Sequence, residues 1–339
     1  AVDASAECEI TAKTGAEAPV FCGWTVATPV LLRYTKGRII RPASARLRRK
    51  RGNGKVNRME QTKKQALAVT AAHARLLAVD MVHAAASGHI GGSLSAMDIL
   101  TLLYGDVMHV DPADPADPDR DRFVLSKGHC TPGLYPTLAL RGFFPVEDLK
   151  MFRRIDGHMS GHAEMHHVKG VDMSTGSLGQ GLSAAVGMAL AGKMDHKDYR
   201  VYALLGDGEL EEGQVWEAAM AAAKFRLDNL CAIVDVNGLQ IDGRTADVMP
   251  SEPLDKKFEA FNWNVQSVDG HDFDALERAF AAAAACREKP TVLLARTVKG
   301  KGVSFMENDA GWHGKAPNDE QYEKAHAELA ATLAELEGK

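Results

Sequence analysis

Two oxygen-bearing side chains, Asp207 and Asn237, each follow an apolar segment of the chain. Asp207 lies between Gly206 and Gly208 directly after the first apolar run, and Asn237 ends the second run further along. Apolar residues recur at helical spacing between the two runs, which predicts strand, tight turn, helix and strand. Parallel strands joined by a helix bring their carboxyl ends to one edge of a sheet, so we expect the two side chains to lie side by side.

A carboxylate, an amide oxygen and a nearby main-chain carbonyl form a hard oxygen site with open positions. Mg²⁺ suits such a site, because it prefers octahedral oxygen ligation and completes its shell with phosphate oxygens and water. Open parallel sheets bind small molecules outside the carboxyl ends of their strands, and the glycines beside Asp207 allow the backbone to approach a ligand closely. A G-D-G turn alone is equally compatible with an ordinary strand–helix loop, but the added Asn237 favours a cation and phosphate site.

A resemblance to the thiamine diphosphate fingerprint, and more closely to transketolases, is carried by GDGELEEGQVWEA and, further on, VDVNGLQIDG. The resemblance implies that Asp207, Asn237 and the carbonyl of Leu239 hold a divalent cation, Mg²⁺ or in its place Ca²⁺ or Mn²⁺, which binds the diphosphate of the cofactor. It also implies that Glu212 is a carboxylate at a subunit interface. Many members carry a second Asn where this chain has Gly238, a variable position whose side chain is not a ligand.

The segment 155–181 is rich in glycine and has little hydrophobic period, which predicts a long irregular loop with a functional role. It ends in STGSLGQG and leads into a helix rich in Gly and Ala. In transketolases a loop of this form lines thiamine diphosphate. The cofactor-binding residues that the resemblance implies are His129, Gly176, Ser177, Leu178, Gly206, Asp207, Gly208, Asn237 and His313.

Four of the thirteen histidines each lie beside a glycine in a loop where a strand or helix ends. A lone histidine is usually a surface or core residue, but this repeated setting predicts exposure in a cleft. Imidazole can take and return a proton at neutral pH and can hydrogen-bond sugar hydroxyls. The motifs S-G-H, L-S-K-G-H, G-H-A-E and W-H-G resemble those lining the transketolase substrate channel. The catalytic residues that this resemblance implies are His89, His129, His162 and His313.

The resemblance also implies individual roles for these histidines. It assigns His89 and His313 to the hydroxyl that exchanges a proton, His129 to a position nearer the cofactor, and His162 to the C1 hydroxyl of the donor. Two motifs depart from common family forms, since S-G-H-I-G replaces S-G-H-P-G and G-H-A-E replaces G-H-P-E. The histidines themselves are kept.

Periodicity along the chain predicts helices that alternate with short apolar strands. The expected strands are 122–126, 201–205, 230–236, 264–268 and 291–297, and the expected helices include 60–86, 95–108, 178–194, 273–287 and 319–336. We expect the glycines that follow the first helix to stop helix formation there. The pattern predicts an α/β fold in which a parallel β-sheet is flanked by helices on both faces, as in the diphosphate-binding domain of thiamine diphosphate enzymes.

Composition limits the class of protein. The 339 residues are 45% hydrophobic and 25% charged, which describes a globular chain with one large core or two modest ones. The five cysteines form no C-x-x-C pair, which favours a reducing, cytoplasmic location over a disulfide framework. No run of eighteen apolar residues is present, so we expect no membrane span.

The first 58 residues differ from the rest in charge, with a net charge of about +8 against about −13 for the remainder. Their basic block at 46–51 is compatible with nucleic-acid contact or a localisation signal, but we interpret it as a solvated tail with no nucleic-acid partner. We expect residues 1–58 to be a disordered extension, Met59 to be the natural start, and 59–339 to form the transketolase domain.

A full transketolase places a pyrimidine-binding domain and a third domain after this one and needs about twice this length. The resemblance, which covers about 66–317, therefore predicts the N-terminal subunit of a split transketolase of the pentose phosphate pathway. Such a subunit would transfer a two-carbon ketol unit between sugar phosphates only with a C-terminal partner that carries the pyrimidine-binding domain and the activating glutamate. We expect the assembly to be a heterotetramer.

Three alternatives remain open at this point. A metal-dependent hydrolase would use the segment 162–167, HAEMHH, which has neither H-E-x-x-H nor H-x-x-E-H spacing. A subunit of another thiamine diphosphate enzyme, such as a deoxyxylulose-phosphate synthase-like protein, is closer but does not account for four channel histidines. A non-catalytic, cofactor-binding relic is the third.

Overall fold

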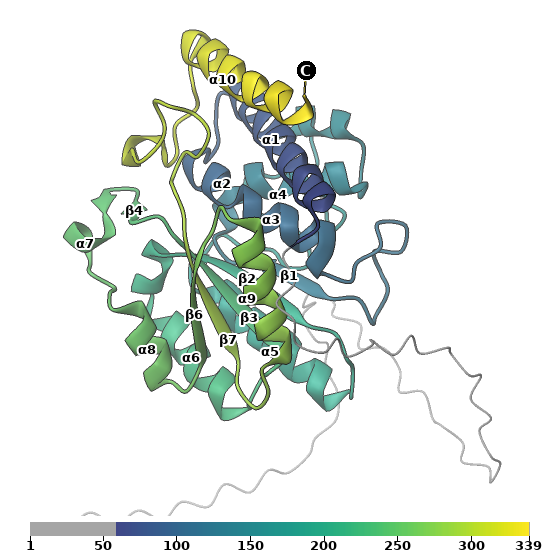
Figure 1. Cartoon of the computed structure of the whole chain (residues 1–339), viewed down its shortest axis with the longest axis vertical. Coiled ribbons are helices and arrows are strands. Elements are labelled where there is room, and N and C mark those ends of the chain that lie inside the picture. Colours follow the sequence, from purple (N-terminus) through teal and green to yellow (C-terminus); the bar gives the residue numbers. More distant parts are fainter. Residues whose placement is uncertain (1–58, 339) are drawn as a thin grey trace, which may run out of the picture. The chain divides into compact units, whose positions relative to one another are not determined.

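A five-stranded parallel sheet lies at the centre of residues 59–338, which are the residues that this computed structural model describes (Figure 1). Its strand order is β1-β2-β3-β7-β6. The strand bounds are β1 Arg122–Leu125, β2 Val201–Gly206, β3 Leu230–Val236, β6 Asn264–Asp269 and β7 Thr291–Arg296. A separate antiparallel pair is formed by β4, Leu239–Gln240, and β5, Gly243–Arg244. The expected parallel sheet is confirmed. The expected extension, residues 1–58, lies outside the described residues, and Met59 is the first residue described.

The central strands β2, β3 and β7 are apolar on both faces because each face packs against its own hydrophobic core. In β3, Cys231 and Ile233 belong to one core, while Ala232 and Val234 belong to the other. All four side chains are fully buried. A parallel strand covered on both sides is expected to have this near-continuous apolar sequence.

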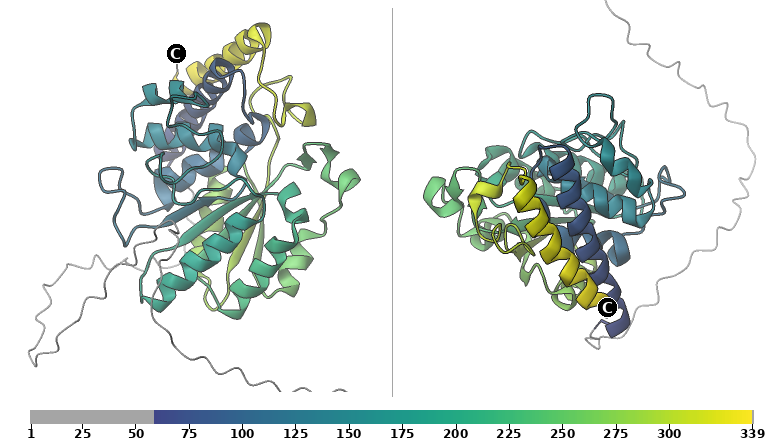
Figure 2. Two further views of the ribbon diagram at one scale, coloured as in Figure 1. Left: turned by 180° about the vertical axis from the view of Figure 1, so that it is seen from behind. Right: turned by 90° about the horizontal axis from the view of Figure 1, so that it is seen from above.

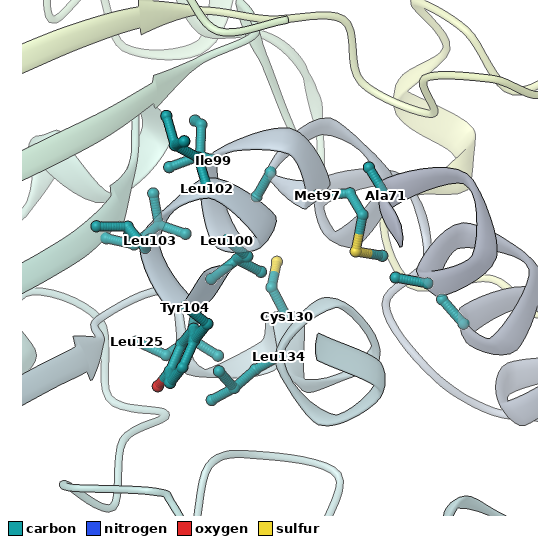
Figure 3. Packing of buried hydrophobic residues seen from close by; sticks show 14 of the residues in the cluster. Ala71, Met97, Ile99, Leu100, Leu102, Leu103, Tyr104, Leu125, Cys130 and Leu134 are labelled. Atoms are coloured by element: carbon teal, nitrogen blue, oxygen red, sulfur yellow. The ribbon is translucent and has the colours of Figure 1, made fainter. Parts of the chain in front are cut away.

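Helices cover both faces of the sheet, as the sequence predicts. The first core includes residues of α3 (Met97–Leu102), α4 (Thr131–Arg141) and α9 (Phe273–Ala285), and the second includes residues of α5 (Gln180–Met194), α6 (Gly213–Lys224) and α8 (Leu254–Ala260). Figure 1 shows α9 in front of the sheet, and the view from behind in Figure 2 shows teal helices on the opposite face. Figure 3 shows the aliphatic side chains of α3 gathered with Cys130 and Leu134.

The first and last helices of the described region lie side by side above this layer. They are α1 (Gln61–Ala84) and α10 (Asp319–Glu337), and the ring of His83 stacks on that of Tyr322 with centroids 4.0 Å apart. By length and composition alone, α1 qualifies as a membrane-spanning candidate. However, 56% of its most apolar window is buried within the structure, which is the arrangement of a core helix.

The first helix ends before the glycine-rich segment, as expected, but two of the glycines begin a further short helix that the sequence analysis did not predict. Gly91 and Gly92 begin α2 (Gly91–Ser95), and the expected helix 95–108 is divided into α3 and a π-helical turn at Leu103–Val107. A Cβ on Gly91 would lie 2.7 Å from the carbonyl oxygen of Trp312, and one on Gly92 would lie 3.1 Å from the sulfur of Cys130. Close packing therefore excludes a side chain at Gly91 and leaves little room for one at Gly92, which local sequence does not reveal.

Because the sheet is buried on both faces, we expect Ile233→Ala in the middle of β3 to destabilise the fold strongly. Ile233 is fully buried, so the loss of its side chain should lower the free energy of unfolding by about 2–5 kcal/mol, measured by denaturant unfolding. Met220→Ala on α6 is a suitable control, because that side chain is 51% exposed and its removal should change stability by less than about 0.5 kcal/mol. Similar small changes for both variants would contradict the arrangement.

Candidate functional site

The strands β1, β2, β3 and β7 run parallel, so the loops that follow them meet at one edge of the sheet. A cleft of about 410 Å³ opens at this edge. Every expected site residue except Ser177 lines it, namely His89, His129, His162, Gly176, Leu178, Gly206, Asp207, Gly208, Glu212, Asn237, Leu239 and His313. Ser177 instead lines a neighbouring hollow of about 470 Å³, which shares Gly176 with the cleft.

Asp207 directly follows β2 and is almost fully buried, with 4% of the residue exposed. Its carboxylate accepts hydrogen bonds from the main-chain N–H of Gly208 at 2.9 Å and of Gly238 at 2.5 Å. The second bond joins the turn after β2 to the turn after β3, as the crossover topology predicts. Burial, together with the nearby carboxylate of Asp235, raises the pKa of Asp207 to about 6.

The other two expected cation ligands border the same cleft. Asn237 donates from Nδ2 to Asp235 at 3.3 Å, and its Oδ1 accepts from the main-chain N–H of Leu239 at 3.2 Å. The carbonyl of Leu239 accepts from Nζ of Lys299 at 3.4 Å. One buried carboxylate and two neutral oxygens are a donor set that fits a hard cation such as Mg²⁺, and the raised pKa of Asp207 marks a carboxylate that a cation would stabilise.

No group of three or more His, Cys, Asp or Glu side chains within residues 59–338 is arranged to hold a metal ion. The segment 162–167, on which the hydrolase alternative depends, is not arranged as such a group. His166 and His167 are exposed, and Glu164 accepts a hydrogen bond from Ser174 at 2.9 Å. The described region therefore offers no centre for that alternative.

A buried ion pair between Lys127 and Asp235 lies beneath the cation ligands, and the sequence analysis missed it. Lys127 also donates to the carbonyl of Gly92 at 2.9 Å, and Asp235 accepts from the hydroxyls of Ser95 and Thr297. Burial alone would raise the pKa of Asp235, but Lys127 and these hydrogen bonds hold it below its ordinary value. An acid inside the apolar strand LCAIVDV was the available signal.

The four expected histidines form one cluster although they come from four separate segments. The ring centroid of His89 lies 5.0 Å from that of His129, 5.8 Å from that of His162 and 5.5 Å from that of His313. The rings of His129 and His313 are 5.1 Å apart and stacked. All four histidines line the cleft described above.

All four imidazoles have lowered pKa values. Burial, followed by the charge of Arg153, lowers the pKa of His89 to about 4, and burial, followed by Lys299, lowers that of His313 to about 3. Burial is also the main cause for His129 and His162, with further effects from Lys127 and Arg153 respectively. The cluster is therefore neutral at pH 7 and free to form hydrogen bonds with sugar hydroxyls.

Lys299 is a second cation that the sequence analysis missed. It follows β7, is 2% exposed, and its ammonium lies 3.2 Å from Nδ1 of His313. Burial and the nearby charge of Lys127 lower its pKa. A lysine just after an apolar strand, at the edge where ligands bind, was the signal that could have indicated it.

Two acidic residues after Asp207 have different environments. Glu209 is buried and accepts hydrogen bonds from Ser126, from the N–H of Gly179 at 2.9 Å and from the N–H of Gly206 at 3.1 Å. It therefore joins the glycine-rich loop to the G-D-G turn, a role that the sequence analysis missed. Glu212 is exposed in the cleft wall, just before α6.

The lowered pKa values predict that His89 and His313 do not titrate near neutrality. In a ¹H NMR titration of the cofactor-free chain, their C2 protons should shift with midpoints near pH 4 and pH 3 and stay constant from pH 6 to 8. The His89→Gln and His313→Gln variants would assign the two resonances. A midpoint at or above the ordinary value of about 6.5 for either ring would show that burial does not control its charge.

Comparison with known proteins agrees with this geometry. Residues 66–334 match the family model described as the thiamine diphosphate binding domain of transketolase. The chain is 48% identical over 255 residues to the 6-deoxy-6-sulfo-D-fructose transketolase subunit SqwG of Clostridium sp. (strain MSTE9), covering 75% of this chain and 93% of that protein. It is 46% identical over 259 residues to one subunit of the apulose-4-phosphate transketolase of Phocaeicola vulgatus, covering 76% of this chain and 92% of that protein.

A solved structure shares the fold as well. The transketolase of Campylobacter jejuni aligns with a TM-score of 0.74 and 34% identity, over 80% of this chain and 45% of that one. The residues that match the family model include every residue that lines the cleft. The chain belongs to the transketolase family, whose thiamine diphosphate-binding domain it contains.

Proposed function

We propose that this chain is the N-terminal subunit of a transketolase that transfers a two-carbon ketol unit from a ketose to an aldose and acts with a second polypeptide. The observation that carries this proposal is the meeting of four neutral histidines with Asp207, Asn237 and Leu239 in one cleft. An oxygen site for a cation and diphosphate then lies beside groups suited to sugar hydroxyls.

In this proposal Asp207, Asn237 and the carbonyl of Leu239 hold Mg²⁺, or Ca²⁺ or Mn²⁺ in its place. Thiamine diphosphate, when bound, supplies the nucleophilic carbon needed to cleave a carbon–carbon bond next to a ketone. The glycines beside Asp207 leave the main chain accessible, and Gly176 and Leu178 line the same cleft, where their backbone would contact the cofactor. Lys299 adds a buried positive charge beside Leu239, which favours an anionic ligand.

The histidines bind and orient the sugar. His89 and His313 contact the hydroxyl that exchanges a proton, because neutral imidazoles can both donate a hydrogen bond to a hydroxyl and accept one from it. His129, mostly buried beside Lys127, lies nearer the cofactor. His162, the most exposed of the four residues, binds the C1 hydroxyl of the donor.

The proposed partner is a C-terminal transketolase subunit that carries the pyrimidine-binding domain and an activating glutamate. Two cleft carboxylates of this chain are already engaged, Glu209 with Ser126 and two main-chain N–H groups, and Glu211 with the amide of Gln240 at 2.8 Å. Glu212 is exposed and available for contact with a partner chain. Both relatives described above are named as subunits of a transketolase, which supports a two-chain enzyme that we propose to be a heterotetramer.

The proposed substrates are sugars with a charged terminal group, principally sugar phosphates. The relatives are named for 6-deoxy-6-sulfo-D-fructose and for apulose 4-phosphate, so specialised ketoses belong in the test beside xylulose 5-phosphate. We propose a cytoplasmic location, in keeping with the free thiols of Cys130, Cys231 and Cys286.

Ketol transfer in a reconstituted mixture tests this function. The chain, a C-terminal transketolase subunit from the same genome, thiamine diphosphate and Mg²⁺ would be combined with each of the three ketoses and with ribose 5-phosphate as acceptor. We expect turnover with at least one ketose in the mixture and none with either chain alone. Turnover by this chain alone would refute the need for a partner, and inactivity of the mixture with all three ketoses would count against the proposed reaction.

A further inference from the structure

A histidine outside the cleft connects the helical layer to the loop that carries Lys299. His271 lies in the turn between β6 and α9, and its side chain is 17% exposed. Its Nδ1 is 2.7 Å from Oδ2 of Asp98, and its Nε2 accepts a hydrogen bond from the main-chain N–H of Val298 at 2.9 Å. Each ring nitrogen therefore has one partner.

These two partners determine where the ring carries its proton. A main-chain N–H can only donate, so Nε2 of His271 must be unprotonated when it accepts from Val298. Nδ1 then carries the hydrogen and donates to Asp98. A second proton on Nε2 would point at the N–H of Val298 and break that bond, so the contact with Val298 requires the neutral ring.

Asp98 is itself fixed from α1. Arg75 binds it through two parallel hydrogen bonds, from Nη1 to Oδ1 at 3.0 Å and from Nη2 to Oδ2 at 2.6 Å. All of Asp98 except 6% is buried. The bidentate geometry holds the carboxylate at one orientation, so the imidazole that it binds is oriented as well.

The segment after β7 is held on each side of Val298. Thr297 donates from its hydroxyl to Asp235, and Gly300 donates from its N–H to the carbonyl of Gly91 at 2.9 Å. The carbonyl of Lys299 accepts from the N–H of Asn308 at 2.9 Å. The bond from Val298 to His271 fixes the peptide between Thr297 and Val298, one residue before Lys299, while the carbonyl of Val298 accepts from the N–H of Lys301 at 3.2 Å.

We propose that His271 is a positioning residue for Lys299. Its unprotonated Nε2 fixes the backbone at Val298, so that the ammonium of Lys299 stays beside Leu239 and His313 in the cleft. The contacts run from Arg75 through Asp98 and His271 to the loop, and they join α1 to the site without touching a ligand. The expected effect on cofactor binding rests on the proposed function, whereas the effect on the loop does not.

Two substitutions separate the two nitrogens of the ring. Gln places its amide oxygen near the position of Nε2 and can accept from Val298, whereas Asn places its amide near Nδ1 and can bind only Asp98. A purely structural role for the link to Asp98 would be served by His271→Asn at least as well as by His271→Gln. The proposal requires the opposite order.

Amide hydrogen exchange of the full chain, followed by mass spectrometry of the peptide that contains 297–302, tests this order. In His271→Asn the exchange of this peptide should be about tenfold faster or more than in the wild type, while in His271→Gln it should stay within about threefold. Thermal unfolding of both variants would show that each is folded. Equal exchange in the two variants, or unchanged exchange in His271→Asn, would overturn the proposal.

Binding of thiamine diphosphate with Mg²⁺, measured by calorimetry on the same proteins combined with the C-terminal partner subunit, supplies the functional measurement. We expect the affinity to fall about tenfold in His271→Asn and to be largely restored in His271→Gln, as for other residues that support a binding group. Equal affinities in the two variants would contradict a role for His271 in placing Lys299. Failure of the wild type to bind the cofactor would refute the proposed function, and the exchange result would then decide the proposal by itself.

Discussion

The buried ion pair between Lys127 and Asp235 is the contact on which the rest of the site depends. Lys127 follows β1 and Asp235 belongs to β3, while Ser95 of α2 and Thr297 after β7 bind the same carboxylate. Both charged residues are at most 2% exposed. Removing one partner of such a pair leaves an uncompensated buried charge, which costs about 3–5 kcal/mol. The pair therefore holds three strand ends and the helical layer in a fixed relation.

The same pair explains why Asp207 is suited to a cation. Asp235 has Lys127 as its counter-ion, but Asp207 accepts hydrogen bonds from main-chain N–H groups and is close enough to Asp235 for its pKa to be raised. A second positive charge near Asp207 would favour its ionised form. The histidines show the converse effect, because burial and the cations around them disfavour protonation. One cleft thus combines the buried carboxylate of Asp207, which favours a cation, with uncharged imidazoles, which favour a sugar.

Much of the fold and part of the site could be predicted because they follow from periodicity and topology. The short apolar runs around Asp207 and Asn237 predicted neighbouring parallel strands, and the glycine-flanked histidines predicted a shared cleft. Lys127, Asp235, Lys299 and Glu209 were missed because their roles depend on partners from other segments, which local patterns do not specify. The short helix that begins at Gly91 and Gly92 was missed for the same reason, since these glycines pack closely against Trp312 and Cys130 from distant segments.

The most direct measurement of the central claim is calorimetric titration of thiamine diphosphate into this chain combined with its C-terminal partner subunit, with Mg²⁺ and with the metal removed by EDTA. Wild-type protein should bind only with Mg²⁺, and Asp207→Ala should weaken binding by more than about tenfold. Asp247→Ala is the matched control, because the side chain of Asp247 is 72% exposed, and it should bind as the wild type does. Equal binding with and without Mg²⁺, or unchanged binding by Asp207→Ala, would contradict a cation-dependent diphosphate site at this sheet edge.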